Sequence, residues 1–154
     1  MPPTLLRVLG APGAGKTLLI ATLVEEFRSL GHFVATSAPR EGATVITMSS
    51  GGRITAERPL TADELCSLVG SVDPRAALLL AEALDAPGSP AVEVLAPGAH
   101  PSTPPADLVA TITSTEVAPG ATRHLAALIE RRIIKGEPPE PERPRGILGR
   151  LFGR

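Results

Sequence analysis

Apolar and polar residues alternate in different rhythms along the first part of the chain. Residues 5–9 form a short apolar run that ends at a glycine, a pattern typical of a buried strand. Over residues 16–30 apolar side chains recur at every third or fourth position, which predicts a helix, and Gly31 supplies its stop. Residues 33–37 predict a second strand. This order of strand, glycine-rich loop, helix and strand indicates one βαβ unit.

A hairpin and a short helix are predicted next. Residues 44–48 and 53–56 read as two strands joined by a turn that contains two glycines. Thr61 and Glu64 then have the spacing of a capping box, which marks the start of a helix. The inner face of this helix is expected to carry Leu65, Leu68 and Val69.

Further along, residues 91–95 and 108–114 predict strands and residues 121–134 predict a closing helix. Between the two strands, residues 96–105 are rich in proline and predict a loop without regular structure. Residues 76–84 fit two descriptions. Helix propensity favours a helix, whereas the length of the apolar run between two breakers suits a central parallel strand.

The character of the chain changes after residue 135. We predict a nucleotide-binding domain over residues 1–135, followed over residues 136–154 by a proline-rich linker and a short apolar and basic tail. Such a tail can dock on a partner or touch an anionic membrane. Three glycines in its last nine residues favour a disordered end instead, without membrane contact.

Composition narrows the classes of partner. The net charge is −1 and the chain has no Trp or Tyr, so both a basic field for nucleic acid and stacking platforms for single strands are missing. Cys66 is the one cysteine, and its neighbours suggest a buried helix position. The N-terminal residues do not form a signal peptide, and no apolar run is long enough to span a bilayer. We expect a cytoplasmic protein.

Candidate chemistry is concentrated in a phosphate loop. Residues 10–17 satisfy the pattern Gly-x4-Gly-Lys-[Ser/Thr], directly after an apolar strand and at the start of a helix. Lys16 is one of only two lysines against thirteen arginines, so a chain that otherwise avoids lysine keeps one here. Its ammonium is expected to bind the β- and γ-phosphates, and the Thr17 hydroxyl to bind Mg²⁺. The residues expected to contact the nucleotide here are Gly10, Gly13, Ala14, Gly15, Lys16, Thr17 and Leu18.

A phosphate-loop architecture needs a strand that carries an acidic residue near its end. We therefore choose the strand interpretation for residues 76–84, with Glu82 as the candidate second group on the metal side and for catalysis, beside Lys16. A solvent-exposed glutamate is the simpler alternative for Glu82, and Asp85 is a second candidate for the same role. The fold class that follows is a three-layer α/β phosphate-loop fold, a mostly parallel sheet flanked by helices with a small hairpin insertion.

The order of these elements resembles accessory protein B of molybdopterin-guanine dinucleotide biosynthesis, a small family of phosphate-loop proteins that bind GTP. Leu80-Ala81-Glu82-Ala83 is similar to the Val-Glu-Gly strand end of that family, and Glu41-Gly42-Ala43 to its Ala-Gly-Ala-like turn. The resemblance covers about residues 4 to 134. It implies a nucleotide-dependent accessory protein that forms a homodimer and acts with a protein partner in cofactor maturation.

The chain also departs from the family pattern. The Lys-His pair and further His and Asp residues that the family carries after its second strand are absent after Ser37, and Ala83 replaces the strand-end glycine. We therefore expect binding of GTP and Mg²⁺ with weak or absent hydrolysis. Glu116 is the candidate for guanine recognition, because a carboxylate after the strand at 108–113 could accept two hydrogen bonds from the base; a surface charge is its alternative role.

Two other functions stay open at this point. One is a small ATP-dependent kinase or NTPase, for which Arg53, Arg58 and Arg75 could supply phosphate contacts, although no lid segment is evident. The other is a non-catalytic nucleotide-binding interaction module. His32, His100 and His124 are not expected to have a catalytic or metal-binding role.

Overall fold

Seven strands form one sheet in the computed structural model, which describes residues 2–138. The strands are β1 (Thr4–Gly10), β2 (Phe33–Arg40), β3 (Ala43–Thr47), β4 (Arg53–Ala56), β5 (Ala76–Glu82), β6 (Ala91–Leu95) and β7 (Leu108–Thr113). The helices are α1 (Lys16–Ser29), α2 (Ala62–Val72) and α3 (Pro119–Ile129), with a 3₁₀ turn at Ser114–Glu116 and a π-helical turn at Glu130–Ile134.

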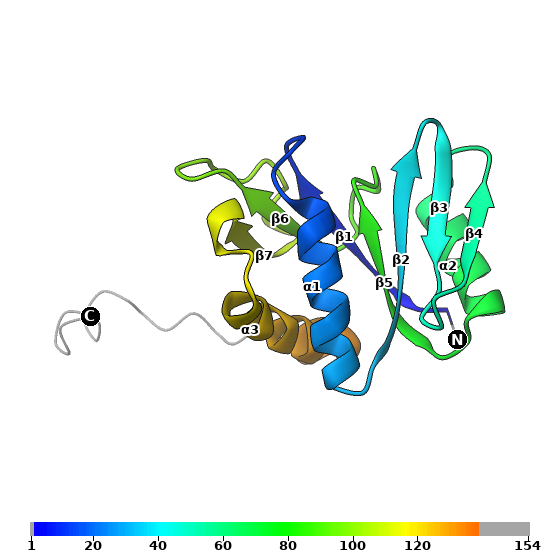
Figure 1. Cartoon of the computed structure of the whole chain (residues 1–154). Coiled ribbons are helices and arrows are strands. Elements are labelled where there is room, and N and C mark those ends of the chain that lie inside the picture. The colour runs from blue at the N-terminus through cyan, green and yellow to red at the C-terminus, as the bar shows by residue number, and fades with distance from the viewer. Residues whose placement is uncertain (1, 139–154) are drawn as a thin grey trace, which may run out of the picture.

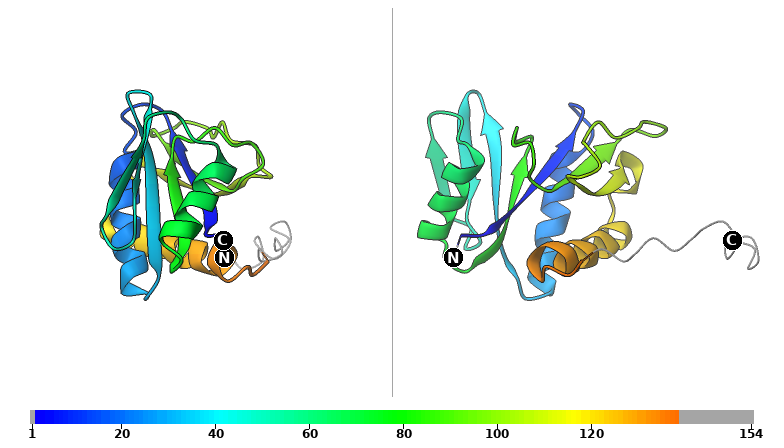
Figure 2. Two further views of the ribbon diagram at one scale, coloured as in Figure 1. Left: turned by 90° about the vertical axis from the view of Figure 1, so that its right-hand side faces the viewer. Right: turned by 180° about the vertical axis from the view of Figure 1, so that it is seen from behind.

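The strand order is β4-β3-β2-β5-β1-β6-β7. Strands β2, β5, β1, β6 and β7 are parallel, whereas β3 and β4 extend the sheet as an antiparallel hairpin. Helices α1 and α3 cover one face of the sheet and α2 covers the other (Figures 1 and 2). The predicted α/β class, a mostly parallel sheet between helices with a hairpin, is therefore confirmed.

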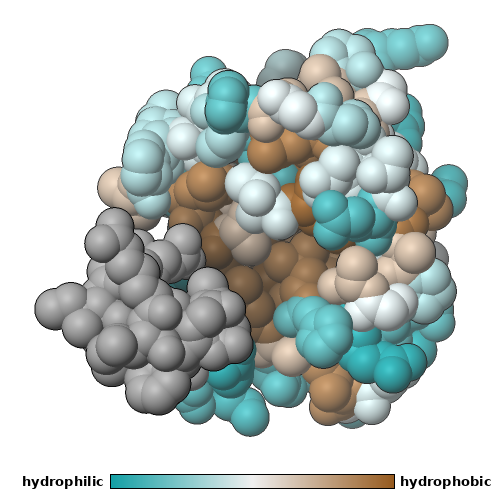
Figure 3. All heavy atoms as spheres, turned by 90° about the vertical axis from the view of Figure 1, so that its left-hand side faces the viewer, coloured by the Kyte–Doolittle hydropathy of each residue, from teal (hydrophilic) through white to brown (hydrophobic). Residues whose placement is uncertain are grey.

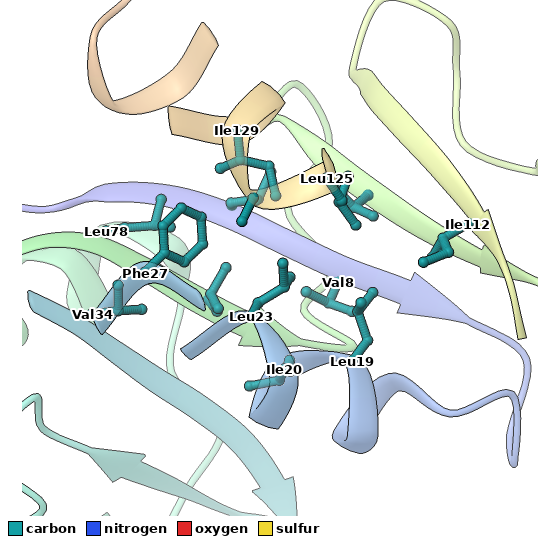
Figure 4. Packing of buried hydrophobic residues seen from close by; sticks show 14 of the residues in the cluster. Val8, Leu19, Ile20, Leu23, Phe27, Val34, Leu78, Ile112, Leu125 and Ile129 are labelled. Atoms are coloured by element: carbon teal, nitrogen blue, oxygen red, sulfur yellow. The ribbon is translucent and has the colours of Figure 1, made fainter. Parts of the chain in front are cut away.

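The larger of two hydrophobic cores lies between the sheet and helices α1 and α3. Figure 4 shows side chains from β1, α1, β5 and α3 meeting there around the fully buried Phe27 and Leu23. The smaller core lies under α2, where Leu65 and Val69 pack against Leu79 of β5. These two cores fix the sheet from both sides and hold the loops at its carboxyl edge in place.

The ambiguous segment at 76–84 is a strand. Strand β5 lies between β1 and β2 in the centre of the sheet, and Leu78, Leu79 and Leu80 are fully buried. Burial on both faces overrides the helical propensity of these residues. The capping box at Thr61 and Glu64 is also present and begins α2 as predicted.

Some sequence expectations were wrong in detail. Strand β2 was expected to end at residue 37, but it continues to Arg40 through Pro39. Proline is tolerated because pairing with β5 stops at Ser37, so the last three residues pair only with β3. The closing helix begins at Pro119 rather than at residue 121, and its last turn is π-helical.

Cys66 was expected to be buried and is only half-buried, because it lies at the border of the face that α2 turns toward the sheet. The tail, which was expected to be disordered, lies outside the described residues apart from its first three positions. Within residues 2–138, no helix is long and apolar enough to cross a membrane. Seen from the β7 edge, the surface has a hollow with apolar residues at its floor (Figure 3).

Candidate functional site

The parallel strands end along one edge of the sheet, and the loop between β1 and α1 lies at that edge. In this loop Gly13 and Gly15 have φ angles of 77° and 101°, in the left-handed region that glycine adopts without strain. The Ala14 amide donates to the Ala11 carbonyl at 3.0 Å and closes the turn. The backbone of the motif is thus curled as a phosphate loop requires.

Gly10 at the start of the loop is required by a close approach. A Cβ atom added to Gly10 would lie 2.8 Å from the backbone oxygen of Val94 on the neighbouring strand β6, which is closer than real Cβ atoms come. The glycine therefore lets β1 deliver the loop directly beside β6.

The first turn of α1 offers free amide hydrogens. No side chain caps the helix at Gly15, and the first turn carries no acidic residue, in contrast to the doubly capped start of α2. Helix N-termini attract anions through these unpaired amides and the helix dipole. An uncapped, non-acidic helix start after a glycine loop is suited to bind a phosphate group.

Lys16 lies over this loop. Its ammonium donates to the carbonyl oxygens of Gly10 at 2.9 Å and Ala11 at 3.2 Å. Both acceptors belong to the loop itself, so the positive charge is held at the loop, beside the uncapped start of α1.

Thr17 and Glu82 are brought together from positions 65 residues apart. The Thr17 hydroxyl donates to Glu82 Oε1 at 2.6 Å, and the Glu82 side chain is only 10% exposed. Glu82 is the last residue of β5, and β5 pairs with β1 so that Glu82 lies opposite Val8. The strand pairing thus places the predicted carboxylate beside the predicted hydroxyl, although their roles toward a metal stay predictions.

The donor set at this point fits Mg²⁺. A hydroxyl and a carboxylate are hard oxygen ligands, and Mg²⁺ usually takes one or two protein oxygens together with phosphates and water. Residues 2–138 hold no group of three or more His, Cys, Asp or Glu side chains suited to a metal. If a divalent ion binds here, Thr17 and Glu82 would hold it, and it would supply neutralisation of phosphate charge.

Arg40 is a neighbour of Glu82 that the sequence did not indicate. Its Nη1 lies 3.7 Å from Glu82 Oε2, and its side chain is 56% exposed. The early strand end expected before Pro39 had left this residue in a loop. The continuation of β2 to Arg40 is what places it at the site.

Three other predicted site residues, Glu116, Asp85 and Leu18, make no side-chain hydrogen bond or ion pair with the loop among the described residues. Glu116 ends the 3₁₀ turn after β7, two strands away from β1, and is exposed. Asp85 is also exposed, and Leu18 is 55% exposed on the first turn of α1. No hydrogen bond or ion pair within residues 2–138 ties any of these three to the phosphate loop.

The arginines considered for a kinase lid are distributed over the surface. Arg58 forms an ion pair with Glu64. The hydrogen bond from Arg58, together with that from Thr61, lowers the pKa of Glu64 to about 2. Arg75 lies over the ring of Phe33, 5.7 Å from its centroid. The described residues therefore give no cluster of lid arginines.

A buried polar network on the α2 side of the sheet was not predicted. Glu93 of β6 is 5% exposed and accepts hydrogen bonds from the amides and hydroxyls of Ser102 and Thr103. Burial alone would raise the pKa of Glu93, but the four donors outweigh it and the pKa is lowered. These bonds hold the proline-rich loop that follows β6 against the sheet, on a part of this face that α2 does not cover.

Arg7 is a second buried polar residue on this face of the sheet, and its contacts are separate from those of Glu93. Its guanidinium donates to the Ser89 carbonyl at 2.6 Å and lies 3.4 Å from Asp107. A cavity of about 590 Å³ lies between the Glu93 network and the phosphate loop, and its wall includes Gly10, Ala11 and Glu93. Arg7 is far in sequence from Ser89 and Asp107, so no local sequence pattern predicts these contacts.

His32 has a partner that sequence spacing did not suggest. Its Nε2 lies 2.6 Å from Glu130 Oε2, 98 residues later, and its ring meets Phe27 edge to face. This pair ties the end of α1 to the end of α3, far from the phosphate loop. It is a structural contact and adds nothing to the site.

Comparison with known proteins bears on the fold. No family model matches the sequence, and no curated protein matches it. Among solved structures, the chain is similar to a MobB protein homolog from Bacillus stearothermophilus, with a TM-score of 0.53 and 17% identity over 86% of this chain and 99% of that one.

Two further structures give the same result. MobB of Bacillus subtilis has a TM-score of 0.52 and 15% identity, over 80% of this chain and 96% of that one. A structure described as molybdopterin-guanine biosynthesis protein B has a TM-score of 0.50 and 17% identity, over 82% and 98%. The structural neighbours of this chain are therefore MobB proteins at low sequence identity, and its fold is the MobB-like phosphate-loop fold that the sequence predicted.

Proposed function

We propose that this chain is a GTP-binding accessory protein of molybdenum-cofactor guanine dinucleotide biosynthesis. It binds the triphosphate together with Mg²⁺ and hydrolyses it slowly or not at all. The observation that carries the proposal is the contact of Thr17 with Glu82 at 2.6 Å, beside a curled phosphate loop and an uncapped helix start. The fold likeness to MobB proteins supports the biosynthetic role.

Weak hydrolysis follows from the groups around Thr17. Glu82 is the carboxylate in contact with Thr17, and a carboxylate that holds Mg²⁺ is not free to orient an attacking water. Within residues 2–138, no histidine and no second carboxylate forms a hydrogen bond or ion pair with Thr17, Glu82 or Lys16. Among the described residues, the groups in contact with Thr17, Glu82 and Lys16 are therefore suited to bind a triphosphate and include no further base for its cleavage.

Guanine specificity rests on Glu116 in this proposal. Glu116 follows β7 at the carboxyl edge of the sheet, where the base of a nucleotide held by the loop could reach its carboxylate. We expect GTP to bind more tightly than ATP, and Glu116→Ala to remove most of that preference. Equal affinities of the wild-type chain for the two nucleotides would contradict the assignment to Glu116.

A homodimer and a protein partner in cofactor maturation also belong to the proposal. Strand β7 borders the sheet, and the apolar hollow beside it offers a surface that a second copy could cover. Sedimentation equilibrium measures the mass in solution. A concentration-independent monomer would remove the dimer from the proposal and leave nucleotide binding intact.

Titration of fluorescent GTP and ATP analogues against the wild-type chain and Lys16→Ala tests the central part. We expect GTP to bind to the wild-type chain and the variant to lose most of the affinity, because Lys16 is the ammonium at the loop. Phosphate release measured over hours then separates binding from catalysis. Rapid release with ATP would favour the kinase or NTPase alternative.

A further inference from the structure

Arg40 and Glu82 lie on the same face of the sheet as α1. Along β5, Leu78 and Leu80 face the core under α1, and Glu82 continues that alternation. Along β2, Val34 faces the same core, and Arg40 continues its alternation at the end of the strand. The arginine therefore lies on the same side of the sheet as the start of α1.

Arg40 belongs to the sheet and not to a loop. Arg40 pairs with Ala43 in the β2–β3 ladder, and the turn between them is closed by Glu41 and Gly42 with φ angles of 50° and 83°. The Arg40 Nη1 also donates to the Pro39 carbonyl at 2.9 Å. The backbone of Arg40 is thus fixed by strand register and a tight turn, at the end of β2 nearest Glu82.

The contact of Arg40 with Glu82 leaves most of the guanidinium free. The two side chains are 3.7 Å apart, and an ion pair of this length on a half-exposed arginine stabilises a fold little. Within residues 2–138, Nε and Nη2 of Arg40 make no hydrogen bond. A planar donor group with unused N–H bonds beside a phosphate loop is suited to bind phosphate oxygens.

The position of Arg40 relative to Thr17 and Glu82 indicates which phosphate it would meet. In phosphate-loop proteins the loop amides surround the inner phosphates, and Mg²⁺ bridges the β- and γ-phosphate oxygens. A metal held by Thr17 and Glu82 would neutralise the charge of the outer phosphates on that side of the loop, where Arg40 lies 3.7 Å from Glu82. The added charge of a γ-phosphate would lie within reach of the free N–H groups.

We propose that Arg40 binds the terminal phosphate and lets this chain distinguish a nucleoside triphosphate from a diphosphate. The inference rests on the proposed function and assigns a specificity residue to that site. Lys16 and the loop amides bind both nucleotides, whereas Arg40 contacts only the triphosphate. Binding of a triphosphate would then differ from binding of a diphosphate by a contact at the end of β2, where Arg40 lies.

Equilibrium binding of GTP and GDP tests this role. Arg40→Ala should weaken GTP binding about tenfold, the effect of losing one charge-assisted hydrogen bond, and should leave GDP binding unchanged. The GTP affinity of Arg40→Lys should lie between those of Arg40→Ala and the wild type, because lysine keeps the charge but lacks the planar guanidinium group. Arg131→Ala is the matched control, since Arg131 is an exposed arginine of the π-helical turn after α3 without an ion pair among the described residues, and it should change neither affinity.

The same titrations contain the results that would overturn the inference. An Arg40→Ala variant with an unchanged ratio of GTP to GDP affinity would rule out contact with the terminal phosphate. The GDP titration separates direct contact from positioning of Glu82: a loss of affinity that is equal for GTP and GDP would assign Arg40 to the positioning of Glu82 instead. A wild-type chain that binds neither nucleotide would refute the proposed function and this inference together.

Discussion

Glu93→Gln tests the buried network beside the phosphate loop. The Glu93 carboxylate accepts from four donors, two of them the backbone amides of Ser102 and Thr103. A glutamine keeps one acceptor oxygen and turns an NH₂ group toward the remaining donors, so about half of these bonds are lost. Hydrogen bonds to a charged acceptor contribute roughly 1.5–3 kcal/mol each, partly offset here because a neutral amide is less costly to bury. We expect the variant to lose about 2 kcal/mol of unfolding free energy at pH 7.

The pH dependence has a definite sign. Hydrogen bonding lowers the pKa of Glu93 in the folded chain from its ordinary value of 4.5. Its contribution to stability is therefore complete above the unfolded-state pKa and is lost as the pH falls through the lower, folded-state pKa. The stability difference between the wild type and Glu93→Gln should be full at pH 7 and shrink steadily below pH 4.5.

Urea denaturation followed by circular dichroism at several pH values measures this difference. Glu57→Gln serves as control, because Glu57 is exposed and has no described hydrogen bond or ion pair; it should match the wild type at every pH. A Glu93→Gln variant as stable as the wild type at pH 7 would refute the network. A difference that stays constant down to pH 3 would show that the carboxylate charge plays no part in it.

Two further substitutions test backbone geometry at the site. Ala83 has a φ of 55° directly after Glu82. Ala83→Gly relieves this left-handed strain and should raise the unfolding free energy, measured by urea denaturation, by about 0.5–1 kcal/mol. A loss of stability would contradict the assigned conformation. Gly10→Ala should lower the melting temperature and weaken GTP binding more than tenfold, because its Cβ would meet the Val94 carbonyl at 2.8 Å. Calorimetric unfolding and a GTP titration measure the two effects. If both match the wild type, the close approach is refuted.

Local patterns were sufficient to predict most of the fold. The phosphate loop, the capping box at Thr61 and the apolar runs each depend on residues close together in the sequence, so their elements could be predicted. The strand at 76–84 required more, since its own propensity is helical. The requirement for an acidic residue near the end of a strand beside the loop decided it, and the structure has that strand with Glu82 as its last residue.

The parts of the site that could not be predicted depend on strand pairing. Arg40 was missed because Pro39 indicates a strand end, and only the one-sided pairing of β2 at that point makes the proline acceptable. The contacts of Arg7 with Asp107 and of Glu93 with Thr103 join residues brought together by the order of β1, β6 and the loop before β7. No periodicity in one sequence encodes such contacts.

The Mg²⁺ dependence of GTP binding tests the central claim most directly. That claim is that Lys16 and the loop bind the phosphates while Thr17 and Glu82 bind the metal. Isothermal titration with GTP, in Mg²⁺ and in EDTA, on the wild type, Thr17→Val and Glu82→Gln gives the answer. We predict tighter binding in Mg²⁺ for the wild type and little dependence on Mg²⁺ for either variant. A wild-type affinity that is the same in Mg²⁺ and EDTA, or absent in both, would contradict the account.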